Sequence, residues 1–375
     1  MEKAENKDRN WVICESCKGN GKRKKRIRKK TRLKHQTALE QSKKTNFEGL
    51  IPDPPKAQMQ ICLNCKGSGI VSAKNKPLPN KENYPHVAII GGGIGGTALA
   101  VACLHRRIPF TLYERDSDFK SRSQGYGLTL QQASKALNGF GISFLKEGVT
   151  STRHVVHTTD GKVIGEWGIR KWGRSDSKTS PKRKNIHIAR QSLRLALLEQ
   201  LNGHESIKWG HQLLDFKESK KGVKLNFQVN NEIKSTKADL LVGADGIRST
   251  VREYIIGEDI TPLNYLGCIV ILGICPLKNL KDIQSSLLDS ATVFQTANGN
   301  ERIYMMPYDT DTVMWQLSFP LSENKAKELS AKGVKALKEE ACKRTQWHSP
   351  VPQVLEATPK TQISGYPVYD RKLLT

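Results

Sequence analysis

The sequence predicts an α/β protein that combines a dinucleotide-binding unit with an antiparallel sheet, preceded by a basic segment that contains cysteine pairs. A β-branched run at residues 86–90 leads directly into glycines and a helix-like segment, the strand–turn–helix order of nucleotide-binding α/β folds. From about 257 to 321, short apolar runs indicate antiparallel strands. Residues 1–84 are polar and have almost no apolar periodicity. We therefore expect two parts, 1–84 and 85–375.

The charge of the chain is concentrated in the first part. The 375 residues include 61 Lys and Arg against 36 Asp and Glu, a formal net charge of +25. Residues 1–84 hold 21 Lys and Arg against 8 Asp and Glu, about half of that surplus. No stretch approaches the ~20 apolar residues of a membrane-spanning helix, and the N-terminus lacks the apolar run of a secretory signal. We expect a cytoplasmic protein whose eight cysteines serve metal binding or burial rather than disulfides.

A glycine motif follows the first strand. Gly91, Gly93 and Gly96 form G-x-G-x-x-G, in which the glycines permit a tight turn, the approach of a pyrophosphate and close packing of the helix on the strand. The free N–H groups at the helix start favour a phosphate there. A second expected strand, 110–115, contains Glu114, placed to accept hydrogen bonds from ribose hydroxyls. Because an acid disfavours a 2′-phosphate, the motif predicts FAD or NAD and does not choose between them.

A second motif lies in residues 239–252, where an apolar strand ends in Gly243, Ala244, Asp245 and Gly246. A carboxylate on a glycine-flanked turn can reach a ribose or polyol hydroxyl. With this motif the sequence resembles the FAD-dependent aromatic hydroxylases, the p-hydroxybenzoate hydroxylase group, from about residue 86 to 375. In detail it is most similar to the tetracycline-inactivating flavin monooxygenases, through YERD (113–116), GYGLTL (125–130), HIARQSLRLALL (187–198) and YPVYDR (366–371).

The resemblance implies an FAD-binding Rossmann-like domain of the GR2 type with an antiparallel-sheet substrate domain. It implies that the three glycines cradle the FAD pyrophosphate and that Glu114 holds the adenosine ribose. Arg115 would then lie near the phosphates, and Arg190 would reach the FAD from a helix start. Asp245 and Gly246 would line the groove where FAD and the nicotinamide cofactor meet.

The activity that the resemblance implies is an NAD(P)H-consuming monooxygenase acting on a cyclic or aromatic small molecule. Because the cofactor carries the difficult chemistry in such enzymes, we nominate no catalytic acid or base. We interpret His154, His157 and His187 as sheet or surface residues. Four residues of one expected strand are candidates for the wall over the flavin, and plain sheet core is an equal alternative for them: Met314, Trp315, Gln316 and Phe319.

One part of the family pattern is missing from this sequence. The family has a Gly-Asp motif shortly after the YPVYDR-like segment, whereas this sequence ends at Thr375. The expectation is a truncated domain, either a fragment or a chain with an incomplete flavin site. Two alternative functions stay open, a scaffold protein with a non-catalytic flavoprotein fold and a flavin reductase or dehydrogenase without oxygen transfer.

Two copies of a cysteine module stand in the first part. Cys14 and Cys17 open one C-x-x-C-x-G-x-G motif, and Cys62 and Cys65 open the other. Two such knuckles can complete a tetrahedral four-sulfur zinc site, and they resemble the zinc region of DnaJ-type chaperones. We predict one structural Zn²⁺, with a redox pair or free thiols as alternatives. The other four cysteines are expected to be buried small hydrophobes: Cys103, Cys268, Cys275 and Cys342.

Between the two modules lies a basic block at residues 22–35, in which ten of fourteen residues are Lys or Arg. Such a block suits phosphate contacts on RNA or DNA, a nuclear address or an acidic partner protein. It contains no aromatic residue for base stacking. A solvated flexible loop is the remaining alternative. Near the other end, apolar spacing predicts a helix over 323–345.

Overall fold

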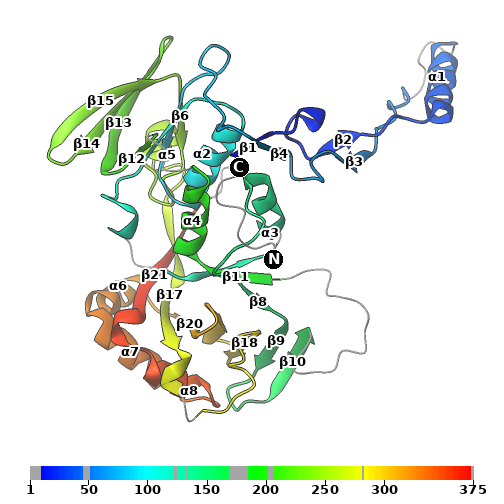
Figure 1. Cartoon of the computed structure of the whole chain (residues 1–375). Helices are drawn as coiled ribbons and strands as arrows, with labels where there is room; N and C mark the ends of the chain where they lie inside the picture. Colours follow the sequence, from blue (N-terminus) through cyan, green and yellow to red (C-terminus); the bar gives the residue numbers. More distant parts are fainter. Residues whose placement is uncertain are drawn as a thin grey trace.

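The computed structural model describes residues 10–44, 51–121, 125–131, 133–168, 185–201, 206–280 and 283–372. The first nine residues of the expected basic part and Thr375 lie outside the described residues. The main body has an upper lobe that contains the parallel strands and a lower lobe that contains a large sheet covered by helices (Figure 1). Helix α4 (Arg190–Glu199) and strand β11 (Asn185–Ala189) lie between the lobes.

The upper lobe is built on a four-stranded parallel sheet. Its order is β12 (Ile207–Lys208), β6 (Phe110–Tyr113), β5 (Val87–Ile90) and β16 (Leu240–Gly243). All four residues of β5 are buried, as expected for a strand that is covered on both faces. The strands expected at 86–90 and 110–115 are thus present, and their carboxyl ends meet at one edge of the sheet.

Different elements cover the two faces of this sheet. On one face, Val87, Ile89 and Leu112 pack against α2 (Ile94–His105) in a common core. On the other face, Ala88, Ile90 and Tyr113 pack against a second, antiparallel sheet. That sheet consists of β13 (His211–Ser219), β14 (Gly222–Val229) and β15 (Glu232–Ala238). The short helix α5 (Thr250–Ile256) follows β16.

A small sheet lies between the lobes and a large one fills the lower lobe. The small antiparallel sheet is formed by β7 (Gly127–Leu130), β11 and β8 (Val149–Ser151), and the short helix α3 (Ala133–Ala136) follows β7. The seven strands of the large sheet are, in order, β10 (Val163–Gly168), β9 (Arg153–His157), β18 (Thr292–Ala297), β19 (Arg302–Pro307), β20 (Thr312–Pro320), β17 (Leu263–Pro276) and β21 (Ile363–Arg371). The large sheet therefore extends beyond the range 257–321 expected from the sequence, because strands from 153–168 and 363–371 pair along its two edges.

Helices α6 (Glu323–Ala331), α7 (Gly333–Arg344) and α8 (Val351–Ala357) cover one face of the large sheet. The prediction of one continuous helix over 323–345 was wrong at one point. Gly333, the first residue of α7, has φ +81°, a left-handed conformation that interrupts the helical backbone after α6, so α6 and α7 are separate helices. Apolar spacing does not register such a break because both helices keep their core positions, Ala326 and Leu337 among them.

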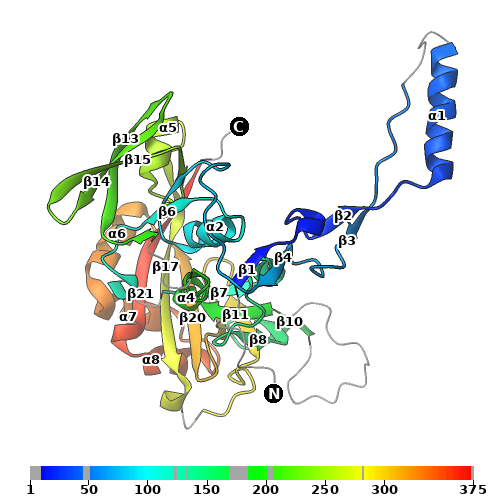
Figure 2. The ribbon, with the colours of Figure 1, turned by 45° about the horizontal axis from the view of Figure 1, so that its top comes forward.

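The N-terminal part forms two short ribbons and a helix. Strand β1 (Asn10–Ile13) pairs with β4 (Ile70–Ala73), and β2 (Lys22–Lys24) pairs with β3 (Met59–Ile61). Helix α1 (Lys29–Lys44) stands at the far end of the second ribbon, away from the main body in both views (Figures 1 and 2). Among the described residues, no helix is long and apolar enough to span a membrane.

Candidate functional site

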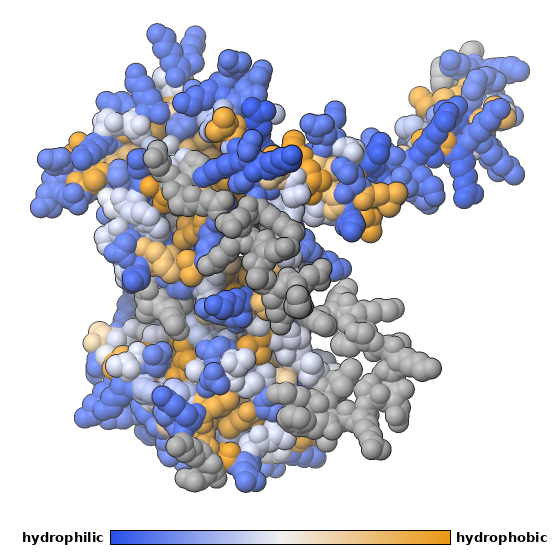
Figure 3. Space-filling view, in the orientation of Figure 1, coloured by the Kyte–Doolittle hydropathy of each residue, from blue (hydrophilic) through white to orange (hydrophobic). Residues whose placement is uncertain are grey.

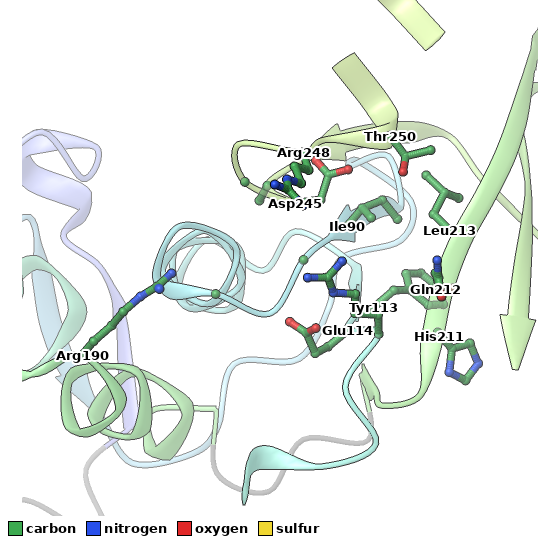
Figure 4. Close-up of a pocket in the computed structure, with 15 residues that line it drawn as sticks. Ile90, Tyr113, Glu114, Arg190, His211, Gln212, Leu213, Asp245, Arg248 and Thr250 are labelled. Carbon is green, nitrogen blue, oxygen red and sulfur yellow. The ribbon is translucent and has the colours of Figure 1, made fainter. Parts of the chain in front are cut away.

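A cleft opens where the parallel strands end and α2 begins (Figure 4). The empty space at the cleft is about 700 Å³, a volume that includes the open solvent at its mouth. Seven of the eight cofactor-binding residues expected from the sequence line it: Gly91, Gly93, Glu114, Arg115, Arg190, Asp245 and Gly246. The remaining one, Gly96, lies beneath the glycine turn. Strands β5, β6 and β16 thus bring together residues that are more than 150 positions apart in the sequence.

The three glycines have different surroundings. A Cβ at Gly93, the N-cap of α2, would meet no atom within 4 Å, so the helix start is open toward the cleft. A Cβ at Gly91 would lie 2.5 Å from the Ala244 carbonyl oxygen, and Gly91 has φ +103°. A Cβ at Gly96 would lie 1.9 Å from the Gly91 carbonyl oxygen. Gly91 and Gly96 therefore allow close backbone packing, whereas Gly93 leaves an accessible helix N-terminus, a natural anion site.

Glu114 is held firmly by backbone groups. The amide of Gly92 donates to its Oε2 at 2.7 Å, and the amide of Asp116 donates to its Oε1 at 3.1 Å. The residue is 4% exposed and lines the cleft. These hydrogen bonds tie the end of β6 to the glycine turn, so the carboxylate has a fixed place beside the N-terminus of α2.

Arg194 is a site residue that our sequence reasoning missed. Its Nε donates to the Gly92 carbonyl oxygen at 2.6 Å, and its Nη2 lies 3.7 Å from the Glu114 carboxylate. The guanidinium carbon lies 5.3 Å from the ring centroids of both Phe119 and Trp209. The signal was available, because Arg194 is one helical turn after Arg190 in the segment HIARQSLRLALL, where i and i+4 share a helix face.

Three arginines line the cleft together with the two acids. Arg190 begins α4, lies 5.5 Å from the Tyr126 ring centroid, and approaches the N-terminus of α2 from the side opposite to most of the labelled residues (Figure 4). Arg115 follows Glu114, and Arg248 lies in the turn after Asp245. Arginines around an open helix N-terminus suit a ligand that carries phosphates.

Asp245 lies in the turn between β16 and α5. Ser249 Oγ donates to its Oδ1 at 2.5 Å, and the Val251 amide donates to its Oδ2 at 3.3 Å. Gly246 has φ +84°, and a Cβ there would meet nothing within 4 Å. The side chain of Asp245 thus fixes the turn, and Gly246 places no side chain on the wall of the cleft.

The large sheet separates the four candidate wall residues into two pairs. Trp315 and Phe319 are fully buried in the core beneath α6–α8, and Trp315 Nε1 donates to Thr358 Oγ1 at 2.8 Å. The wall interpretation was therefore wrong for these two, which are sheet core. Met314 belongs to a different core on the opposite face, where its sulfur accepts a hydrogen bond from the Gly127 amide at 3.0 Å, and Gln316 alternates onto that same face.

The three histidines named from the sequence lie in sheet strands. His187 is fully buried, with Nε2 2.7 Å from Ser151 Oγ and Nδ1 3.0 Å from Thr129 Oγ1. Burial, and secondarily the charge of His154, lowers the pKa of His187 to about 4. His154 stacks on Trp167 with ring centroids 5.4 Å apart. Burial likewise lowers the pKa values of His154 and His157.

The cysteine modules converge on a second site. The four sulfurs of Cys14, Cys17, Cys62 and Cys65 lie within 4.8 Å of one another, and all four residues are buried. Contacts across the modules are 3.9 Å for Cys14–Cys62 and 3.6 Å for Cys17–Cys65, too long for disulfides. The amides of Gly21 and Gly69 donate to the sulfurs of Cys17 and Cys65. This arrangement is compatible with a metal site.

The remaining cysteines differ in how deeply they are buried. Cys103 and Cys275 are buried, whereas Cys268 and Cys342 are only half-buried. Burial raises the pKa of each of these four thiols. The expectation that these cysteines are buried is therefore confirmed for Cys103 and Cys275 and was wrong for Cys268 and Cys342.

The curated relatives of this chain include FAD-dependent monooxygenases. A probable FAD-dependent monooxygenase of Arthroderma benhamiae is 31% identical over 176 residues, 45% of this chain and 38% of the relative. The aurachin C monooxygenase/isomerase of Stigmatella aurantiaca is 26% identical over 76% of this chain and 69% of the relative. The chain thus spans well under half of the first relative's length.

Solved structures share the fold. HpxO of Klebsiella pneumoniae, in complex with FAD and uric acid, has a TM-score of 0.62 and 19% identity, covering 77% of this chain and 69% of that one. A tetracycline destructase has a TM-score of 0.51 and 16% identity, covering 77% and 71%. The family described as "FAD binding domain" matches residues 84–364. The chain therefore belongs to the FAD binding domain family.

Proposed function

We propose that this chain is an FAD-dependent, NAD(P)H-consuming monooxygenase that hydroxylates a cyclic or aromatic small molecule. The observation that carries the proposal is the cleft at the N-terminus of α2, where a bare helix start, two carboxylates and three arginines converge. The family match and the monooxygenase names of the relatives support the same assignment.

The residues of the cleft fit FAD. Gly93 offers open space at the helix N-terminus for a pyrophosphate, and Arg115 and Arg190 supply positive charge beside it. Glu114, fixed by the Gly92 and Asp116 amides, would accept hydrogen bonds from the ribose hydroxyls. Asp245 and Gly246 would form the wall where the flavin end and the nicotinamide meet.

The overall reaction consumes one substrate, one O₂, one NAD(P)H and one proton, and yields hydroxylated substrate, water and NAD(P)⁺. Bound FAD supplies the redox chemistry. The protein's own part is to hold the cofactor, to orient the substrate and to exclude water. On the large sheet, Met314 and Gln316 lie on the face opposite α6–α8, and we propose that this face contributes to the substrate wall.

Flavin binding is the decisive test. The purified chain should be yellow, or become so when FAD is added, and NAD(P)H should bleach that colour under nitrogen. Gly93→Ala should fold as stably as the parent, because its Cβ has room, yet lose at least tenfold in FAD affinity. Gly95→Ala, where a Cβ also meets nothing within 4 Å, is the matched control and should keep its affinity. A folded chain that remains colourless with FAD would overturn the proposal.

We further propose that the four-cysteine cluster holds one structural Zn²⁺. The observed sulfur separations of 3.6 and 3.9 Å support this, because Zn–S bonds of ~2.3 Å in a tetrahedron set sulfurs about 3.8 Å apart. Four thiolates require a reducing compartment, which favours the cytoplasm as the location. Metal analysis of the purified chain should therefore find about one zinc per chain.

A further inference from the structure

A basic arm extends from the cysteine cluster. We define it as residues 22–44, which comprise β2, the connection to α1, and α1 itself. It holds twelve Lys and Arg and one acidic residue, Glu40. The arm stands away from the body in two orientations (Figures 1 and 2), and its surface in the view of Figure 3 is largely hydrophilic. No residue of the arm lines the cleft in which we propose that FAD binds, so the proposed flavin chemistry does not require this surface.

Helix α1 keeps its charges on one side. No residue of α1 is buried, and the half-buried ones recur at helical spacing on one face: His35, Ala38, Leu39 and Ser42. A ring nitrogen of His35 lies 3.1 Å from the Pro52 carbonyl oxygen, so this face turns toward the returning segment. The six Lys and Arg of the helix are all exposed and fall outside that face: Lys29, Lys30, Arg32, Lys34, Lys43 and Lys44.

The base of the arm is structured. Strand β2 pairs with β3, and the Lys25 amide donates to the Gln58 carbonyl oxygen at 2.7 Å. The Cys62 amide donates to the Gly21 carbonyl oxygen at 2.9 Å, which links this ribbon directly to the cysteine cluster. The alternative of a loop without structure was therefore wrong for this part of the chain. The fold presents the cationic face of α1 at a distance from the body.

We propose that the basic arm binds duplex nucleic acid through its phosphate backbone, without base-sequence preference. A helix of 16 residues is about 24 Å long, and a duplex carries one phosphate per ~1.7 Å of axis, so many cations can meet phosphates at once. The arm contains no Phe, Trp or Tyr, the side chains that single-strand binders use for stacking. Lysine is depleted from protein–protein interface cores, which disfavours an acidic protein as the partner.

The test is binding of the full chain to a fluorescein-labelled 20-base-pair duplex of random sequence, followed by anisotropy from 50 to 300 mM NaCl. We expect the logarithm of the affinity to fall linearly with the logarithm of salt concentration. The quadruple variant K29Q/K30Q/R32Q/K34Q should flatten that slope by up to about 3.6, at ~0.9 for each phosphate that is no longer neutralised. At 100 mM NaCl it should bind at least tenfold more weakly.

The matched control removes four exposed lysines from the β13–β14 hairpin, K217Q/K220Q/K221Q/K224Q, and so changes the net charge equally. It should keep most of the affinity and the slope. The proposal is overturned if the full chain does not bind the duplex at 50 mM NaCl, or if the control loses as much affinity as the arm variant. It is also overturned if poly-L-glutamate of equal charge displaces the duplex as effectively as unlabelled duplex does, since the arm would then suit an acidic protein.

Discussion

The guanidinium of Arg194 lies 3.7 Å from the carboxylate of Glu114, and both side chains are at least 95% buried. The same guanidinium donates to the Gly92 carbonyl oxygen, while the Gly92 amide donates to Glu114. Helix α4, the glycine turn and the end of β6 are thus joined by one hydrogen-bonded group. Gly92 lies 102 residues and Glu114 lies 80 residues before Arg194 in the sequence. The cleft therefore depends on long-range contacts that no local motif contains.

Replacing Arg194 by Met should destabilise the fold markedly, because it leaves a buried carboxylate without its cation. Breaking a buried ion pair costs about 3 kcal/mol of unfolding free energy or more. Urea unfolding followed by circular dichroism measures this. The control is Lys234→Met, which removes an exposed ion pair to Glu232 at 3.9 Å and should change the free energy by less than ~1 kcal/mol. Equal effects in the two variants would contradict the structural role of Arg194.

Gly96 and Gly95 offer a second matched pair. A Cβ at Gly96 would lie 1.9 Å from a backbone oxygen, so Gly96→Ala must push α2 away from the glycine turn and should cost about 2 kcal/mol or more. At Gly95 the same methyl meets nothing within 4 Å inside the helix, so Gly95→Ala should be neutral or stabilise by up to ~1 kcal/mol. Thermal unfolding of the two variants checks this, and the idea fails if both change stability in the same direction.

The sequence was most informative where one residue type satisfies a backbone requirement. Gly91 and Gly96 could be interpreted from the sequence alone because only glycine allows those close approaches. For Arg194 the sequence placed the residue on the same helix face as Arg190, but it did not reveal the contacts with Glu114 and Phe119 on distant segments. The same limit applied to Trp315 and Met314. These neighbours lie on opposite faces of one strand, and the sequence does not show which of the two faces the helices cover.

For the four-cysteine cluster, by contrast, the sequence did predict a contact between distant segments. Doubled C-x-x-C modules predict convergence because thiolates at that spacing can share a metal, and the four sulfurs do lie together. The sequence did not reveal that the N-terminal part packs on the body. A Cβ at Gly141 would lie 2.4 Å from Trp11 Nε1, and one at Gly19 would lie 3.2 Å from Arg106 Nη2. Such contacts depend on the shapes of two surfaces that are each formed by separate segments.

Metal removal should loosen the two ribbons of the N-terminal part. Chelation of the proposed zinc is expected to release about one metal ion per chain and to raise hydrogen exchange in residues 10–24 and 59–73, the segments that carry the cysteines. Cys62→Ser should reproduce the effect without a chelator. Cys268→Ser, a half-buried cysteine outside the cluster, is the control and should retain its zinc. Metal content by mass spectrometry and exchange by peptide mapping would decide, and full zinc retention in Cys62→Ser would rule out a four-cysteine site.

The buried His187 should make the free energy of unfolding depend on pH. Its ring nitrogens face Thr129 and Ser151 in a fully buried position, and its pKa is lowered to about 4, against about 6.5 for an unfolded histidine. Between these values the unfolded chain binds more protons, so His187 adds stability above pH 6.5 that is lost as the pH falls through 4.

The expected loss from this residue is about 3 kcal/mol between pH 7 and pH 4. Urea unfolding across this range should show a shallower pH dependence in His187→Gln than in the parent chain. Nuclear magnetic resonance provides the direct check, because the Cε1 proton signal that disappears in His187→Gln should titrate near pH 4. A titration near pH 6.5 would mean that the ring is hydrated when charged, and would contradict the buried hydroxyl environment of His187.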